Sequence, residues 1–71
     1  RLNLALAKIR KGSYDEAIEA AREVIQRDPR RPLAQFYLGQ ALLAKGMKQE
    51  AGEAFQKARE LDPKLNVPAI P

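Results

Sequence analysis

The chain has 71 residues, of which 45% are hydrophobic and 31% charged, and its formal net charge is +4. This length limits it to one small domain, and its apolar runs fall far short of the about 20 residues that a membrane-spanning helix needs. His, Cys and Thr are absent and Ser13 is the only serine. A nucleophile activated by an imidazole and a metal held by His or Cys are therefore excluded, which leaves a purely acidic site as the remaining catalytic option. We expect no enzyme, no cofactor and no metal.

The first half of the chain predicts two helices joined by a short turn. The first helix runs from about Leu2 to Arg10 and stops at Gly12, which tolerates the positive φ of a helix C-cap. Ser13 and Glu16 then have the spacing of a capping box, in which each side chain bonds a free amide of the first helical turn. The second helix follows and extends to about Ile25.

The second half predicts the same arrangement again. Asp28-Pro29 ends the second helix, and a third is expected over about Pro32–Lys45 because proline suits a first helical turn. Gly46 turns the chain, and a fourth helix covers about Lys48–Leu61 before another Asp-Pro pair. Met47 replaces the capping serine here, so we expect the fourth helix to start less firmly.

The two halves are related by a shift of 34 residues, which aligns 1–31 with 35–65. Such self-similarity is the mark of a repeat architecture, and the matches fall at small, Gly and Pro positions where packing and turns constrain the sequence. The identical pairs are Leu4/Leu38, Ala7/Ala41, Lys11/Lys45, Gly12/Gly46, Glu16/Glu50, Ala17/Ala51, Glu19/Glu53, Ala20/Ala54, Asp28/Asp62 and Pro29/Pro63. Small residues in the second helices, with Gly39 opposite them, predict a close approach of neighbouring helices.

This pattern resembles the tetratricopeptide repeat family, whose motif places Leu-Gly in the first helix, then Ala, an aromatic, Ala and a closing Pro. The second unit carries Leu38, Gly39, Ala51, Phe55, Ala58 and Pro63, and the first carries Leu4, Ala5, Ala17 and Pro29. The first unit departs from the motif at Ala21 and Val24, and Gln35 stands at the family's early tryptophan position.

The resemblance implies an all-α fold, an α-solenoid of antiparallel helix-turn-helix repeats wound into a right-handed superhelix. The expected units are a first repeat over 1–31, cut short at its start, a second over 32–65, and a proline-containing tail over 66–71. The resemblance also implies that the first helix of each repeat lines a concave face.

The third helix is apolar around most of its circumference, so we expect it to be buried on more than one side. One stripe packs inside the repeats, and the other, with matching residues of the first helix, would form an apolar groove for a partner's helix or extended segment. The alternative is that the aliphatic members only fill the space between adjacent first helices. The candidate binding residues are Leu2, Asn3, Leu6, Ile9, Arg10, Leu33, Phe36, Tyr37, Gln40 and Leu43.

Two other kinds of partner are not favoured. Chaperone-binding members of the resembled family grip a terminal carboxylate with lysines, asparagines and an arginine. The corresponding positions here hold Leu2, Leu6, Leu33 and Tyr37, and Asn3 falls on one asparagine position without its companions. The basic charge invites a nucleic-acid interpretation. Each basic cluster is interleaved with acids, as at Arg27-Asp28, and no aromatic residue stands among the charges to stack on a base.

The function predicted from the sequence is a protein–protein interaction module, and the alternative is a homo-oligomerisation element of a larger scaffold. Pro68 and Pro71 forbid an ordinary helix after the second repeat. We therefore expect an uncovered flank of the fourth helix near Phe55, Ala58 and Leu61, to which the tail, another copy or the rest of a longer protein would bind. The sequence assigns no compartment.

Overall fold

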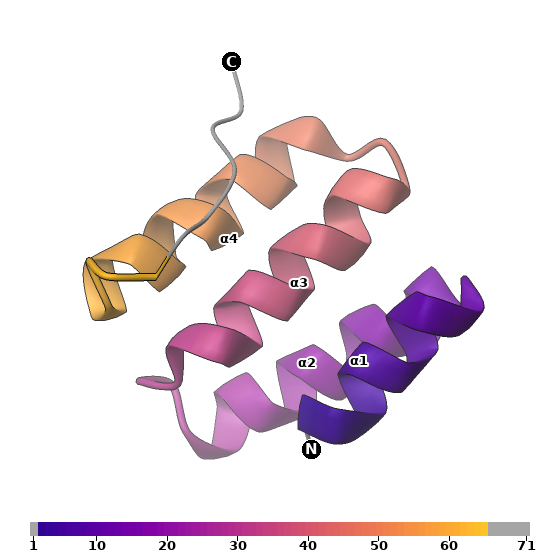
Figure 1. The fold of residues 1–71 in the computed structure, drawn as a ribbon, viewed down its shortest axis with the longest axis horizontal. Coiled ribbons are helices and arrows are strands. Elements are labelled where there is room, and N and C mark those ends of the chain that lie inside the picture. Colours follow the sequence, from indigo (N-terminus) through magenta and orange to yellow (C-terminus); the bar gives the residue numbers. More distant parts are fainter. Residues whose placement is uncertain (1, 66–71) are drawn as a thin grey trace.

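A computed structural model describes residues 2–65, which form four α-helices arranged as two antiparallel hairpins (Figure 1). Both ends of each helix lie within about two residues of the prediction. The agreement is close because Gly and Asp-Pro end the helices through local chemistry. The tail that the sequence analysis placed over 66–71 lies outside the described residues. The helices are α1 Leu2–Lys11, α2 Tyr14–Arg27, α3 Pro32–Ala44 and α4 Lys48–Leu61.

A left-handed glycine ends the first helix of each hairpin. Gly12 and Gly46 have φ of +83° and +85°. The amide of Gly12 donates to the carbonyl of Ile9 (3.0 Å), and the amide of Ser13 donates to the carbonyl of Lys8 (2.8 Å). Equivalent bonds follow Gly46, both at 2.9 Å. This is the Schellman pattern, which satisfies the last carbonyls of a helix and needs a residue that tolerates positive φ.

The predicted capping box does not form. The Ser13 side chain makes no hydrogen bond to the start of α2, and Glu16 instead pairs with Lys8 across the turn, with 3.0 Å between Oε1 and Nζ. The expectation of a weaker start for α4 assumed that Ser13 caps α2, and this assumption is wrong. Met47 adopts nearly the same backbone conformation as Ser13, with φ −88° and ψ 69°, so neither helix start depends on a hydroxyl cap.

The second helix of each hairpin ends in the same turn. The Oδ1 atom of Asp28 accepts the amide of Arg30 (3.3 Å), and Oδ1 of Asp62 accepts the amide of Lys64 (3.1 Å). An Asp side chain that bonds a backbone amide two residues later stabilises a turn, and the proline between them prevents the helix from continuing. The 34-residue period is therefore present in the turn geometry as well as in the amino-acid sequence.

Helix α3 lies in the centre of the molecule and packs against the other three helices. Small side chains fill most of its contacts with α2 and α4, as predicted. The buried side chains form two hydrophobic clusters, and Leu38 joins them into one core because it packs against both. The larger cluster contains Ala17, Ile18, Ala41, Leu42, Ala51, Ala54 and Phe55, and the smaller contains Ala5, Ala20 and Ala21.

The ring of Phe55 sits directly over Gly39. A Cβ atom added at Gly39 would come within 2.7 Å of this ring, so the position requires glycine. The Phe55 ring also packs on Phe36, with 5.8 Å between ring centroids. The predicted uncovered flank is therefore mostly covered, since Phe55 is 2% exposed and Ala58 is fully buried, while Leu61 remains exposed. The aromatic ring turns toward α3 to fill the space that Gly39 leaves.

Candidate functional site

The helices α1 and α3 run side by side at the front of the molecule in Figure 1, with α1 in front of α2. Their side chains form what we call the α1–α3 surface. It consists of the predicted residues that lie on these two helices beyond the first turn of α1. The residues are Leu6, Ile9, Arg10, Leu33, Phe36, Tyr37, Gln40 and Leu43.

The apolar members of this surface are half-buried. Ile9, Phe36 and Leu43 pack on the larger core cluster, and Tyr37 packs on the smaller one. Phe36 and Tyr37 also contact each other, with their ring centroids 5.8 Å apart. Each of these side chains therefore packs on the core with one part and keeps another part exposed to solvent. The larger cluster comes from α2, α3 and α4, whereas the smaller one includes Ala5 of α1. Side chains that the core already holds lose less conformational freedom on binding, which lowers the entropic cost of binding.

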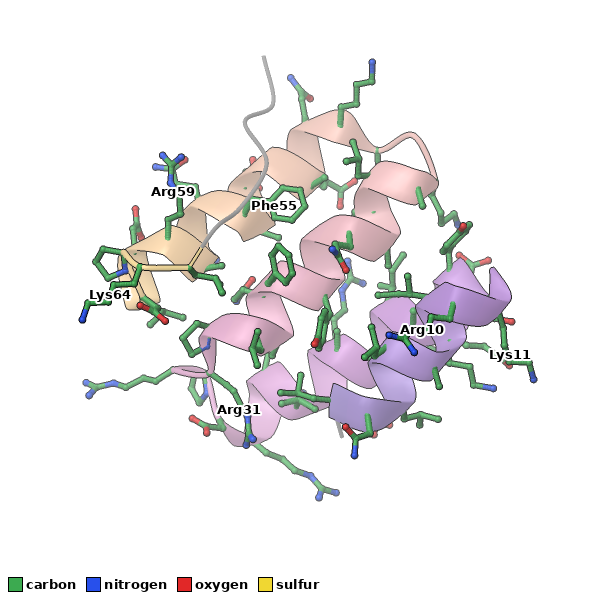
Figure 2. The ribbon with its side chains drawn as sticks, in the orientation of Figure 1. Arg10, Lys11, Arg31, Phe55, Arg59 and Lys64 are labelled. Atoms are coloured by element: carbon green, nitrogen blue, oxygen red, sulfur yellow. The ribbon has the colours of Figure 1, made fainter. Side chains whose placement is uncertain are left out.

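Leu33 and Arg10 are the more exposed members. Leu33, in the first turn of α3, is 39% exposed. Arg10 is exposed on α1 one turn after Leu6, which shares its side of the helix. Figure 2 shows Arg10 on the side of α1 that faces the viewer. The surface thus combines an aromatic pair with an exposed leucine and a single exposed arginine.

Leu2 and Asn3 take part in a different feature. They line a hollow of about 750 Å³ between the start of α1, the end of α2 and the turn that follows it. Leu4, which is 51% exposed, lines the same hollow. The sequence analysis did not identify this hollow. The Leu4/Leu38 pair was a signal for it, because Leu4 occupies the repeat position at which Leu38 packs on a neighbouring hairpin. The other residues of the lining are Glu23, Val24, Arg27, Asp28 and Arg31.

Gln35 is a further residue whose place the sequence did not reveal. It is a polar side chain at 7% exposure inside a mostly apolar helix. It lines a smaller hollow of about 140 Å³ between α2, α3 and α4, together with charged side chains such as Arg22 and Lys57. Gln35 therefore belongs to the junction between the hairpins rather than to the α1–α3 surface.

The repeated turns, the shared core and the 34-residue period define a protein built from stacked helical hairpins. The family model for the tetratricopeptide repeat matches residues 2–66. The chain belongs to the tetratricopeptide repeat family. It is also similar to the small glutamine-rich tetratricopeptide repeat-containing protein 2 of Mycosarcoma maydis, with 42% identity over 65 residues. These residues are 92% of this chain and 18% of that relative's length.

Tetratricopeptide repeats generally mediate protein–protein interaction, and the family points to a non-catalytic module. The fold is an all-α solenoid of antiparallel helical hairpins, as the family resemblance implied. Within the described residues, none of the helices combines the length and the apolar character that crossing a membrane requires.

Proposed function

We propose that the chain binds a helical or extended segment of a partner protein on the α1–α3 surface. The observation that carries this proposal is the half-buried state of Phe36, Tyr37 and Leu43 next to the exposed Leu33. Phe36 and Leu43 pack on the larger core cluster and Tyr37 packs on the smaller one, so these side chains also contribute to the core. They keep part of their surface free, however, and an aromatic side chain with one apolar and one wet end is typical of interfaces.

Tyr37 provides the first test, because the chain offers a matched control in Tyr14 at the start of α2. Peptides that bind are first selected from a displayed random library. We then expect Tyr37→Ala to weaken their binding about fivefold or more, since removing an interface tyrosine commonly costs over about 1 kcal/mol. Tyr14→Ala should leave the affinity unchanged. Fluorescence anisotropy measures both, and a selection that yields no binders would refute the proposal.

A second pair of variants keeps the test independent of stability, because Tyr37 also touches the core. Leu33 and Leu61 are almost equally exposed, at 39% and 38%, and only Leu33 lies on the proposed surface. Leu33→Gln should weaken peptide binding while Leu61→Gln should not, and neither should lower the melting temperature by much. Equal effects of the two variants would argue against the α1–α3 surface.

The alternative function is assembly with other copies of the chain. The molecular mass of the same variants distinguishes this assembly from the binding of a partner segment. If the surface binds a foreign segment, light scattering should give the same mass for the wild type and for Leu33→Gln. A mass that falls with Leu33→Gln, while peptides bind neither protein, would favour homo-oligomerisation instead.

A further inference from the structure

The charges of this protein are unevenly divided between the two helices of each hairpin. Helix α1 carries Lys8, Arg10 and Lys11 and no carboxylate, and α3 carries no charged residue at all. Every one of the nine acidic residues belongs to α2, α4 or the turns that follow them. The two helices that form the α1–α3 surface therefore contribute positive charge only.

We propose that the segment bound on the α1–α3 surface is acidic, with a carboxylate side chain placed against Arg10. This inference rests on the proposed function and adds the chemistry of the partner. Charge complementarity carries it: a partner lying along α1 and α3 meets apolar side chains and the guanidinium of Arg10, and no acid on either helix. A basic segment would find nothing on these helices to neutralise it and would meet like charge at Arg10.

The carboxylates nearest to this end of α1 are already engaged. Among residues 2–65, the ion pairs join Glu16 to Lys8 and Asp15 to Lys45. Each pair joins a carboxylate of the first turn of α2 to a lysine, Lys8 in α1 or Lys45 just after α3, and neither pair involves Arg10. Arg10 and Lys11 are both exposed on α1, and Figure 2 shows Arg10 on the side that faces the viewer and Lys11 at the right-hand edge. Arg10 is therefore the cation that we place against the partner's carboxylate.

The apolar residues beside Arg10 set the rest of the partner's character. Leu6 lies one turn before Arg10 on the same side of α1, and Phe36, Tyr37 and Leu43 lie on α3. A complementary segment has apolar side chains toward these residues and an acidic residue at its margin. A nucleic acid would need a different surface, with several cations along the path of its phosphates and exposed aromatic side chains on which its bases could stack.

Three synthetic peptides test the proposal. They share one amphipathic pattern of Leu and Ala, and their polar positions hold Glu in the first, Gln in the second and Lys in the third. We expect the Glu peptide to bind the wild-type chain about fivefold more tightly than the Lys peptide at low salt, because an exposed charge pair and its like-charge counterpart differ by about 1 kcal/mol. The difference should shrink as salt screens the charges.

Arg10→Glu is the deciding variant, and Arg22→Glu is its control. Both change the net charge by the same amount, and Arg22 is exposed on α2, away from the α1–α3 surface. The preference for the Glu peptide should disappear or reverse in Arg10→Glu and persist in Arg22→Glu. A preference that both variants lose equally would reflect net charge alone and would overturn the assignment to Arg10.

The remaining outcomes distinguish this inference from the proposed function. If the three peptides bind the wild type equally and Leu33→Gln weakens all of them, the surface is a binding site and the inference about charge is wrong. If none binds, the inference about charge fails, and the peptides selected from the library decide the proposed function separately. Tight binding of single-stranded RNA that Arg10→Glu abolishes, with no peptide bound, would assign Arg10 to a nucleic acid.

Discussion

Two glycines in the interiors of helices show how one residue type can have opposite effects on stability. At Gly39 a Cβ atom would lie 2.7 Å from the ring of Phe55, whereas at Gly52 a Cβ atom would meet nothing within 4 Å. Glycine costs a helix about 1 kcal/mol relative to alanine at either position. At Gly39 this cost is offset by the packing of the aromatic ring, while at Gly52 nothing in the structure offsets it.

We therefore predict that Gly39→Ala destabilises the protein and Gly52→Ala stabilises it. The Phe55 ring is 2% exposed and packed within the core, so overpacking should cost about 1–3 kcal/mol, more than the gain in helix propensity. Gly52→Ala should raise the free energy of unfolding by about 0.5–1 kcal/mol. Urea unfolding followed by circular dichroism measures both changes.

The double variant Gly39→Ala/Phe55→Leu provides the control for the first of these effects. If the ring causes the loss, the combined change should be smaller than the sum of the two single changes, because the leucine makes room for the new methyl group. A strictly additive result would mean that the close contact is not the source of the destabilisation.

At the scale of whole elements, the start of α2 gives a result that the sequence did not predict. Ser13 stands where a capping serine is expected, yet its side chain makes no capping bond. We predict that Ser13→Ala lowers the free energy of unfolding by less than about 0.5 kcal/mol, instead of the about 1 kcal/mol typical of a lost cap.

Gly12→Ala is the comparison for Ser13→Ala within the same turn. Its φ of +83° is strained for any residue with a Cβ atom, so this variant should cost about 1–2 kcal/mol. Thermal unfolding of the two variants should show a clearly larger fall in the melting temperature for Gly12→Ala. The reverse order would mean that the serine hydroxyl holds the helix start after all.

The helices themselves could be predicted from the sequence because their boundaries depend on local chemistry. Glycine at positive φ and proline after aspartate act within a few residues, and both recur at the 34-residue spacing. The side-chain partners could not be predicted in the same way. Glu16 had a local option at Ser13 and a more distant one at Lys8, and the position of Lys8 relative to α2 depends on how the hairpin closes. Local spacing cannot choose between two such partners.

The candidate site was predictable to a similar extent. The apolar pattern of α3 indicated two environments for its apolar side chains, and Phe36, Tyr37 and Leu43 are indeed partly buried against the core and partly exposed. The packing of Phe36 on Phe55 was not predicted. It depends on the space above Gly39 and on how α4 packs against α3, and no local sequence signal reports the packing of two separate helices. Long-range packing of this kind decides how much of each side chain remains free for a partner.

At the scale of the whole molecule, equal positions in the two hairpins have unequal neighbours. Leu4 and Leu38 are identical residues at the same place in the period, yet Leu38 packs on both core clusters while Leu4 is 51% exposed at the hollow beside α2. The difference arises because α3 has a hairpin on its preceding side and, in the described residues, α1 has none. In a stacked array, stability comes from such interfaces as much as from the hairpins themselves.

We predict from this asymmetry that Leu38→Ala and Leu4→Ala differ in their effect on the free energy of unfolding. Leu38→Ala removes a side chain that joins the two clusters and should cost about 2 kcal/mol, whereas Leu4→Ala should cost less than about 0.5 kcal/mol. Urea unfolding of both variants at several protein concentrations is the measurement. If Leu4→Ala proved as costly as Leu38→Ala, and more so at higher concentration, Leu4 would be buried in solution by a second copy. A cost that is small and independent of concentration would mean that the hollow at Leu4 stays open in the isolated chain.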